Sequence, residues 1–131
     1  MARRAGGGPT SAELDILKVL WELGPSATGA VREALVRTRP VGYTTVQKML
    51  QTMTKKRLVT CDRGQWPHLY RHRESRSLVV GRMVKELLSR ALDGSRARLL
   101  LHALESEPVS PEELAEMRQL LDTMENPEPE P

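Results

Sequence analysis

The sequence predicts a mostly α-helical protein that carries one small β-hairpin. Apolar residues recur at helical spacing as far as residue 57, short segments rich in β-branched and aromatic residues follow as far as residue 72, and helical spacing returns from Arg76 onward. At 131 residues the chain has the length of one small domain with a helical appendage.

The first two helices are recognised by their ends. Thr10 with Glu13 three residues later fits a capping box, and Gly24 followed by Pro25 is a typical helix stop. A second helix is expected to begin after Thr28. The segment TRPVG, residues 38–42, should end it, because the residue before a proline avoids the helical region.

The third helix is predicted over residues 44–57, with Thr44 as its expected N-cap. Val46, Met49, Leu50 and Met53 follow helical spacing and predict one buried face. The opposite face carries only Thr, Gln and Lys, and the stretch has no acidic residue. An ordinary solvated helix mixes both charges, because Glu–Lys pairs stabilise it. This polar face therefore favours an anionic partner.

A β-hairpin is predicted directly after the third helix. The segments RLVTC and HLYRH are separated by DRGQWP, in which Gly and Pro mark a turn. Three helices followed by a hairpin is the order of a winged helix-turn-helix, which we assign to residues 10–74.

Three further helices are predicted over residues 75–125. They begin near Arg76, Ser95 and Ser110, and each displays a full apolar stripe. A core of about 45 residues is marginal on its own, so we expect these stripes to be buried in a homodimer. The expected interface residues are Val80, Val84, Leu87, Leu88, Leu99, Leu100, Leu104, Leu114, Met117, Leu120 and Leu121. The terminal segments 1–9 and 126–131 are expected to be disordered.

Charge is distributed unevenly along the chain. The net charge is +3, but residues 40–73 hold seven basic residues and one acidic residue, Asp62. Such a basic segment indicates a polyanionic partner, most often nucleic acid.

Other functional classes find little support in the sequence. Cys61 is the only cysteine, and neither a secretory signal nor a membrane-spanning run is visible, which predicts a cytoplasmic protein without membrane insertion. His68 and His72 lie on one predicted strand, about 13 Å apart, too far to bind one metal ion. We predict no enzyme activity, no metal and no cofactor.

Three segments in this order resemble the BlaI/MecI/CopY family of penicillinase-type transcriptional repressors. They are AELDILKVLWELG, YTTVQKMLQTMTKKRLV and the strand LYR, and the resemblance extends through SPEELAEMRQLLD to cover about residues 11–124. It implies a winged-helix DNA-binding domain, a helical dimerisation domain and palindromic operators.

The resemblance also implies partners for some members. Penicillin-responsive members are cleaved at an Asn-Phe bond when a membrane sensor-protease detects a β-lactam. His102 and Ala103 stand at the matching positions here, and the cysteine-rich metal ligands of the copper-responsive branch have no counterpart in this C-terminal tail. Arg57 replaces a glycine that many relatives carry after the lysine.

Candidate DNA contacts fall in two groups. On the third helix, contacts to bases and phosphates are expected from Thr44, Thr45, Gln47, Lys48, Gln51 and Lys55. In the wing and its flanks, contacts to phosphates are expected from Lys56, Arg57, Arg63, His68, Arg71 and Arg73. The alternative for each is a solvated surface or, for His68, packing. Trp66 is expected to pack under the hairpin.

Two functions therefore stand beside each other. The first is a homodimeric, sequence-specific repressor that places the helix 44–57 in the major groove of a palindromic operator. The alternative is a winged-helix adaptor for acidic protein partners, or a protein that binds DNA without sequence preference.

Overall fold

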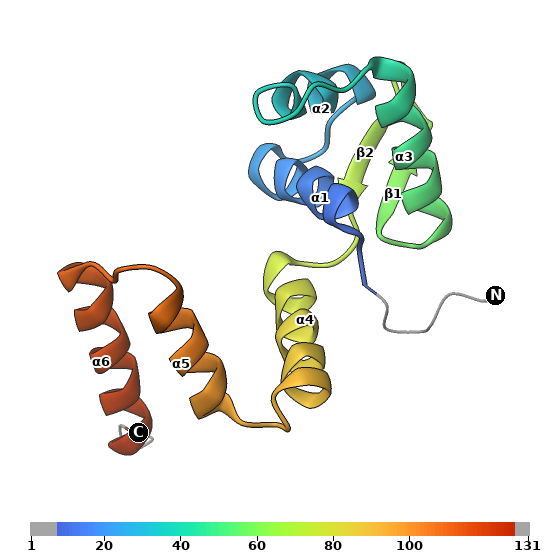
Figure 1. Ribbon diagram of the computed structural model, residues 1–131. Helices are drawn as coiled ribbons and strands as arrows, with labels where there is room; N and C mark the ends of the chain where they lie inside the picture. The colour runs from blue at the N-terminus through green and yellow to red at the C-terminus, as the bar shows by residue number, and fades with distance from the viewer. Residues whose placement is uncertain (1–7, 128–131) are drawn as a thin grey trace. The chain divides into compact units, whose positions relative to one another are not determined.

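The computed structural model describes residues 8–127, which form six helices and one two-stranded antiparallel sheet (Figure 1). The elements follow the order α1 (Ser11–Leu23), α2 (Thr28–Leu35), α3 (Tyr43–Lys55), β1 (Val59–Asp62), β2 (Leu69–His72), α4 (Arg76–Ala91), α5 (Arg96–Ser106) and α6 (Pro111–Glu125). The predicted fold class, mostly helical with a small hairpin, is confirmed. The disorder expected of residues 1–7 and 128–131 lies outside the described residues.

Several predicted helix ends are confirmed by their hydrogen bonds. The Thr10 side chain accepts from the Glu13 amide, and the Glu13 carboxylate accepts from the Thr10 amide, which completes a capping box. Gly24 ends α1 with a positive φ of 83°. Ser95 and Ser110 cap α5 and α6 by accepting from the third helical amide in each case.

Two predicted helix starts are wrong. Thr28 is the first residue of α2, and Ala27 is its N-cap. The N-cap of α3 is Gly42 and not Thr44, because the extended backbone of Gly42 already presents its carbonyl to the Val46 amide. The helix therefore covers residues 43–55 rather than 44–57, and Thr44 lies within its first turn.

The core of the N-terminal part is built from the apolar faces of α1, α2 and α3, closed by the hairpin. Ile16, Leu17 and Leu20 of α1 meet Val31 and Leu35 of α2 in this cluster. Helix α3 contributes Val46, Leu50 and Met53, and the hairpin contributes Val59 and Tyr70. The apolar stripe predicted for α3 is thus the buried one, which leaves its polar face outward.

The hairpin is joined to the helices through β2. Cys61 pairs with Tyr70 in the antiparallel register, and Tyr70 exchanges backbone hydrogen bonds with Ser26, which precedes α2. The segment before α2 thus forms a single antiparallel β-bridge with β2. This arrangement holds the hairpin against the α1–α3 core and leaves the turn between its strands free to project.

The described chain divides into two compact units, one ending at Glu86 and the other beginning at Leu87. The first unit contains the three helices, the hairpin and the first part of α4. The second contains the end of α4 with α5 and α6. Among the residues that the structure describes, no helix is long and apolar enough to cross a membrane.

Candidate nucleic-acid interface

The exposed side of α3 carries an ordered row of polar side chains. Thr44, Lys48, Gln51 and Lys55 are all exposed, and their spacing of four, three and four residues places them on one face of the helix. We call this row the outer face of α3. It lies opposite the buried Val46, Leu50 and Met53, while Thr45 and half-buried Gln47 flank it on its two sides. The structure therefore brings the six predicted α3 contacts onto or beside one surface.

The start of α3 is open to a ligand. No side chain caps it, and its first turn has no acidic residue. The first amides of a helix have no intrahelical acceptor, and they carry the positive end of the helix dipole. An anion next to Tyr43, Thr44 or Thr45 would meet both backbone donors and hydroxyl groups.

The end of α3 is closed by a Schellman motif that turns the chain into β1. The Leu58 amide donates to the Met53 carbonyl at 2.9 Å, and the Arg57 amide donates to the Thr54 carbonyl at 3.1 Å. Arg57 adopts the left-handed conformation, with φ of 67°, which a glycine would adopt without strain. Its side chain is exposed beside Lys55 at the end of the helix.

Lys56 is held by an ion pair within the unit. Its Nζ lies 2.8 Å from Oε2 of Glu13, a residue that is only 5% exposed. Burial alone would raise the pKa of Glu13, but hydrogen bonds from Lys56 and from the Thr10 backbone outweigh it, so the pKa lies below its ordinary value of 4.5. The ammonium of Lys56 therefore has an intrachain partner, whereas Lys48, Lys55 and Arg57 have exposed side chains.

The wing tip, residues 63–68, is organised by Asp62. The carboxylate of Asp62 accepts from the Gly64 amide at 2.9 Å and from the Gln65 side chain at 3.2 Å, and these bonds hold its pKa below the ordinary value. Arg63 and Arg71 are exposed near this turn, and His68 is half-buried, whereas Arg73 is exposed at the opposite end of the hairpin, where its amide donates to the Leu58 carbonyl. The one acidic group of the wing is thus occupied with local donors.

Trp66 does not pack under the hairpin, contrary to expectation. Its side chain is 84% exposed and touches His68 edge to face. The hairpin has only two short strands, and Tyr70, on the strand itself, fills the space beneath them. Trp66 sits in the turn, beyond the edge of the core.

The start of α4 is fastened to the winged-helix unit by Glu74 and Trp21. The Trp21 Nε1 donates to the Glu74 carbonyl at 3.1 Å, and the Arg76 guanidinium lies 6.0 Å from the Trp21 ring centroid. The Glu74 carboxylate pairs in bidentate fashion with Arg82. These contacts set where the polypeptide leaves the winged-helix unit.

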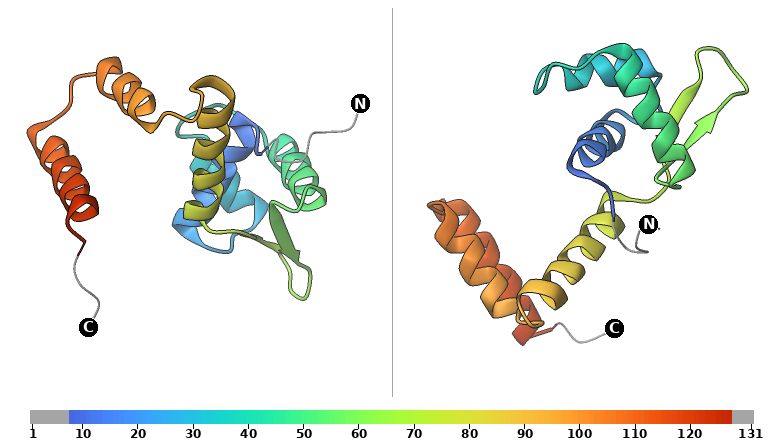
Figure 2. Two further views of the ribbon diagram at one scale, coloured as in Figure 1. Left: turned by 90° about the horizontal axis from the view of Figure 1, so that it is seen from below. Right: turned by 45° about the vertical axis from the view of Figure 1, so that its right-hand side comes forward.

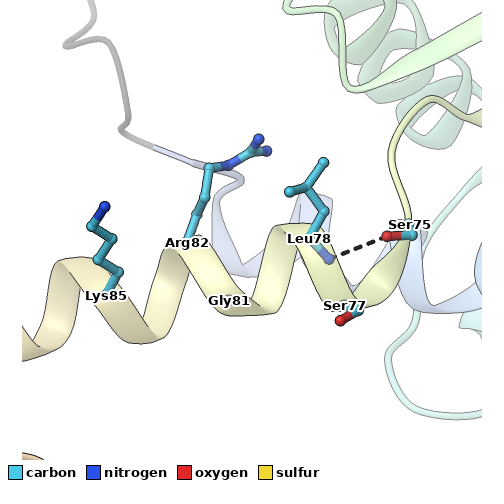
Figure 3. A pocket seen from close by; sticks show the side chains of 6 residues that line it. All are labelled: Ser75, Ser77, Leu78, Gly81, Arg82 and Lys85. Atoms are coloured by element: carbon cyan, nitrogen blue, oxygen red, sulfur yellow. Dashed lines mark hydrogen bonds between the residues drawn. The ribbon is translucent and has the colours of Figure 1, made fainter. Parts of the chain in front are cut away.

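A shallow hollow lies on the surface of α4, lined by Ser75, Ser77, Leu78, Gly81, Arg82 and Lys85. Figure 3 shows Leu78, Arg82 and Lys85 projecting on one side of the helix. Arg82 is already bonded to Glu74, and the hollow is open, so it offers no enclosed site. Within residues 8–127, no group of three or more His, Cys, Asp or Glu side chains could hold a metal ion.

The predicted interface residues of the C-terminal helices differ in exposure. Leu88 is buried, and Leu99, Leu104 and Met117 are half-buried. The others are exposed. Four further exposed apolar residues, Leu78, Met83, Leu101 and Met124, are not among the predicted interface residues. Leu78, Met83 and Leu101 are apolar residues outside the predicted stripes, whereas Met124 continues the stripe of the last helix. Glu13 was considered only as a cap, although its spacing from Ile16, Leu17 and Leu20 marks the buried face of α1.

Comparisons with known proteins agree with this arrangement. The model of the penicillinase repressor family matches residues 9–123. The chain is 37% identical over 95 residues to the transcriptional regulator BlaI of Mycobacterium tuberculosis, a match that covers 71% of this chain and 69% of that protein. It is 28% identical over 127 residues to the penicillinase repressor of Bacillus licheniformis, covering 89% of this chain and 91% of the relative.

Proposed function

Because the chain belongs to the penicillinase repressor family, whose named relatives are transcriptional regulators, we propose that it represses transcription as a homodimer bound to a palindromic operator. Residues 10–74 would form the DNA-binding domain, and residues 75–125 would form the dimerisation region. The observation that carries the proposal is the outer face of α3, an exposed, carboxylate-free row on the third helix of a winged-helix unit.

Helix α3 would enter the major groove with its first turn toward the bases. In helix-turn-helix proteins the first residues of this helix meet base edges. Gln47 can pair in bidentate fashion with adenine, and the Thr45 methyl group can pack on a thymine methyl. Thr44 would then donate to a phosphate beside the open helix start.

The basic residues around this helix would bind the phosphate backbone. Lys48 and Lys55 on α3, with Arg57 behind them, would neutralise phosphates beside the major groove, and Arg63, Arg71 and Arg73 would do so from the wing. Such contacts fix register and affinity but do not select sequence. Lys56 would contribute by holding the end of α3 through Glu13.

The apolar residues of α4–α6 would form the contact between two copies. Leu120 and Leu121 of α6 and Leu87 of α4 are each about half exposed in the single chain, and a second copy that covered them would remove their apolar area from water. Two half-sites bound by one dimer match the symmetry of a palindrome.

Release of the operator would follow from weakening the dimer, since one half-site alone binds poorly. His102 and Ala103, at the positions of the family's cleaved bond, are exposed on α5. Because these residues differ from Asn-Phe, we infer that a sensor-protease of that specificity would not cut this bond, and that another signal would act on the dimer.

The experiment that tests the proposed function is a binding titration on DNA from upstream of the chain's own gene. An unrelated duplex of equal length serves as the control, and both are titrated at low and near-physiological salt. The affinity for a specific site exceeds the affinity for non-specific DNA by about 10³-fold or more. Equal and steeply salt-dependent binding to both duplexes would contradict sequence-specific repression at this site and favour recognition of charge alone.

A further inference from the structure

Trp66 is the most exposed large apolar side chain of the described residues, at 84%. Burying an aromatic side chain of this size removes a large apolar area from water, which stabilises whatever complex buries it. The core of the unit is closed without it. The exposed ring of Trp66 is therefore available for an intermolecular contact.

The wing tip is ordered around Trp66 by contacts of its neighbours. Two hydrogen bonds to Asp62 fix the backbone at Gly64 and the side chain of Gln65. The rings of Trp66 and His68 meet edge to face, with centroids 5.0 Å apart and planes at 81°. The hairpin turn projects clear of the three helices (Figure 2, right). A side chain carried on an ordered turn loses less conformational freedom on binding than one carried on an unstructured segment.

The charges around Trp66 indicate the kind of partner. Arg63 and Arg71 are exposed beside the wing tip, and the Asp62 carboxylate is occupied by local donors. The surroundings are therefore cationic, which suits a polyanion. Duplex DNA also offers apolar surface, the deoxyribose sugars and base edges of the minor groove, into which proteins insert apolar side chains.

We propose that Trp66 contacts duplex DNA directly, with its ring against the deoxyribose sugars of the minor groove next to the major groove that α3 occupies. The inference rests on the proposed DNA-binding function and extends it. Its physical content is an apolar contact at the wing, distinct from the phosphate contacts of the neighbouring arginines. It would add affinity without releasing counterions.

The first test compares three variants on the upstream duplex across a range of salt concentrations. Trp66→Ala is expected to weaken binding about tenfold while leaving the dependence of affinity on salt unchanged. Arg63→Ala is expected to weaken binding and to reduce the salt slope by about one. Leu23→Ala, which truncates an exposed leucine at the end of α1, is the matched control and should bind as the unaltered chain does.

The second test uses fluorescence. The chain has two tryptophans, so Trp21→Phe leaves Trp66 as the only one. Upstream duplex should change the Trp66 emission and shield it from acrylamide. If Trp21→Phe destabilises the unit, the difference between the unaltered chain and Trp66→Phe gives the same signal.

The outcomes separate this inference from the function on which it rests. Unchanged affinity of Trp66→Ala together with unchanged emission, while the unaltered chain binds duplex, would overturn the inference and leave the repressor proposal standing. A salt slope reduced by Trp66→Ala would also overturn it, because an apolar contact releases no counterions. Failure of the unaltered chain to bind any duplex would instead refute the proposed function.

Discussion

Glu13 is the residue at which the local structure of α1 meets the tertiary packing of α3. Its carboxylate completes the capping box with Thr10 and also accepts from Lys56 at the end of α3. A more exposed pair, between Asp15 and Arg39, joins the same helix to the segment before α3. The two pairs differ in burial, and buried pairs cost far more to break than exposed ones.

Glu13→Gln is expected to lower the free energy of unfolding by about 1–2 kcal/mol. Glutamine can still complete the capping box, so the loss isolates the pairing with Lys56. Asp15→Asn is the control and should cost less than about 1 kcal/mol. Urea unfolding at fixed chain concentration measures both, and equal losses would contradict a special role for the buried pair.

The same carboxyl predicts a pH dependence. The pKa of Glu13 is lowered in the folded state, so the folded chain releases its proton more readily than the unfolded chain. Its stabilising contribution is fully present above the ordinary pKa of 4.5 and is lost as the pH falls through the lower folded value. When the free energy of unfolding is measured from neutral pH downward, it should fall less steeply with acid in Glu13→Gln than in the unaltered chain.

Two substitutions on α3 separate sequence preference from charge. Gln47→Ala is expected to relax preference at one base pair, with a cost of about 1–3 kcal/mol against the operator. Lys55→Ala should weaken binding to all duplexes similarly and reduce the salt slope by about one. Titrations against a set of singly altered duplexes distinguish the two effects. An unchanged sequence preference in Gln47→Ala would show that Gln47 makes no base contact.

At the scale of the element, α3 ends in a conformation that its own residue does not favour. Arg57 occupies the left-handed position of the Schellman motif, where a glycine is less strained by about 1 kcal/mol. A charged side chain at this position suggests that its contribution to DNA binding outweighs the strain.

Arg57→Gly is therefore expected to stabilise the protein by about 1 kcal/mol and to weaken DNA binding. Arg57→Ala is its matched control, because it removes the charge and keeps the strain. Thermal unfolding and duplex titration should show both variants weakened in binding and only the glycine variant stabilised. Unimpaired binding by both would mean that Arg57 makes no phosphate contact.

At the scale of the whole molecule, the C-terminal helices carry many exposed apolar side chains, among them Leu87, Leu101, Leu120 and Leu121. Leu121→Glu, on α6, should lower the dimer affinity at least tenfold, because it places a charge in the proposed interface. Sedimentation across a concentration series measures this change. Leu23→Glu adds the same charge at an exposed leucine of the winged-helix unit and should leave the oligomeric state unchanged.

A weaker dimer should also have a lower affinity for the full operator. On a full palindrome Leu121→Glu should bind much less tightly, whereas on a single half-site it should bind like the unaltered chain. Weakening on both duplexes to the same degree would indicate that the substitution damages the fold rather than the contact between copies.

The sequence by itself determined the elements and the polar face of α3. Apolar spacing at Val46, Leu50 and Met53 predicts the buried side, and the side that carries only polar and charged residues is expected to face outward, because burying those groups without partners is costly. The capping box at Thr10 and the stop at Gly24 are local hydrogen-bond patterns, which neighbouring residues specify without the rest of the fold.

The tertiary structure alone decided which polar side chains have partners within the chain and which turn residues are exposed. Lys56 and Lys55 are adjacent in the sequence, yet only Lys56 meets a buried carboxylate, which α1 supplies from 43 positions away. Trp66 is exposed because Tyr70 already fills the space beneath the hairpin. Such outcomes depend on contacts between distant segments, and periodicity along the chain carries no information about them.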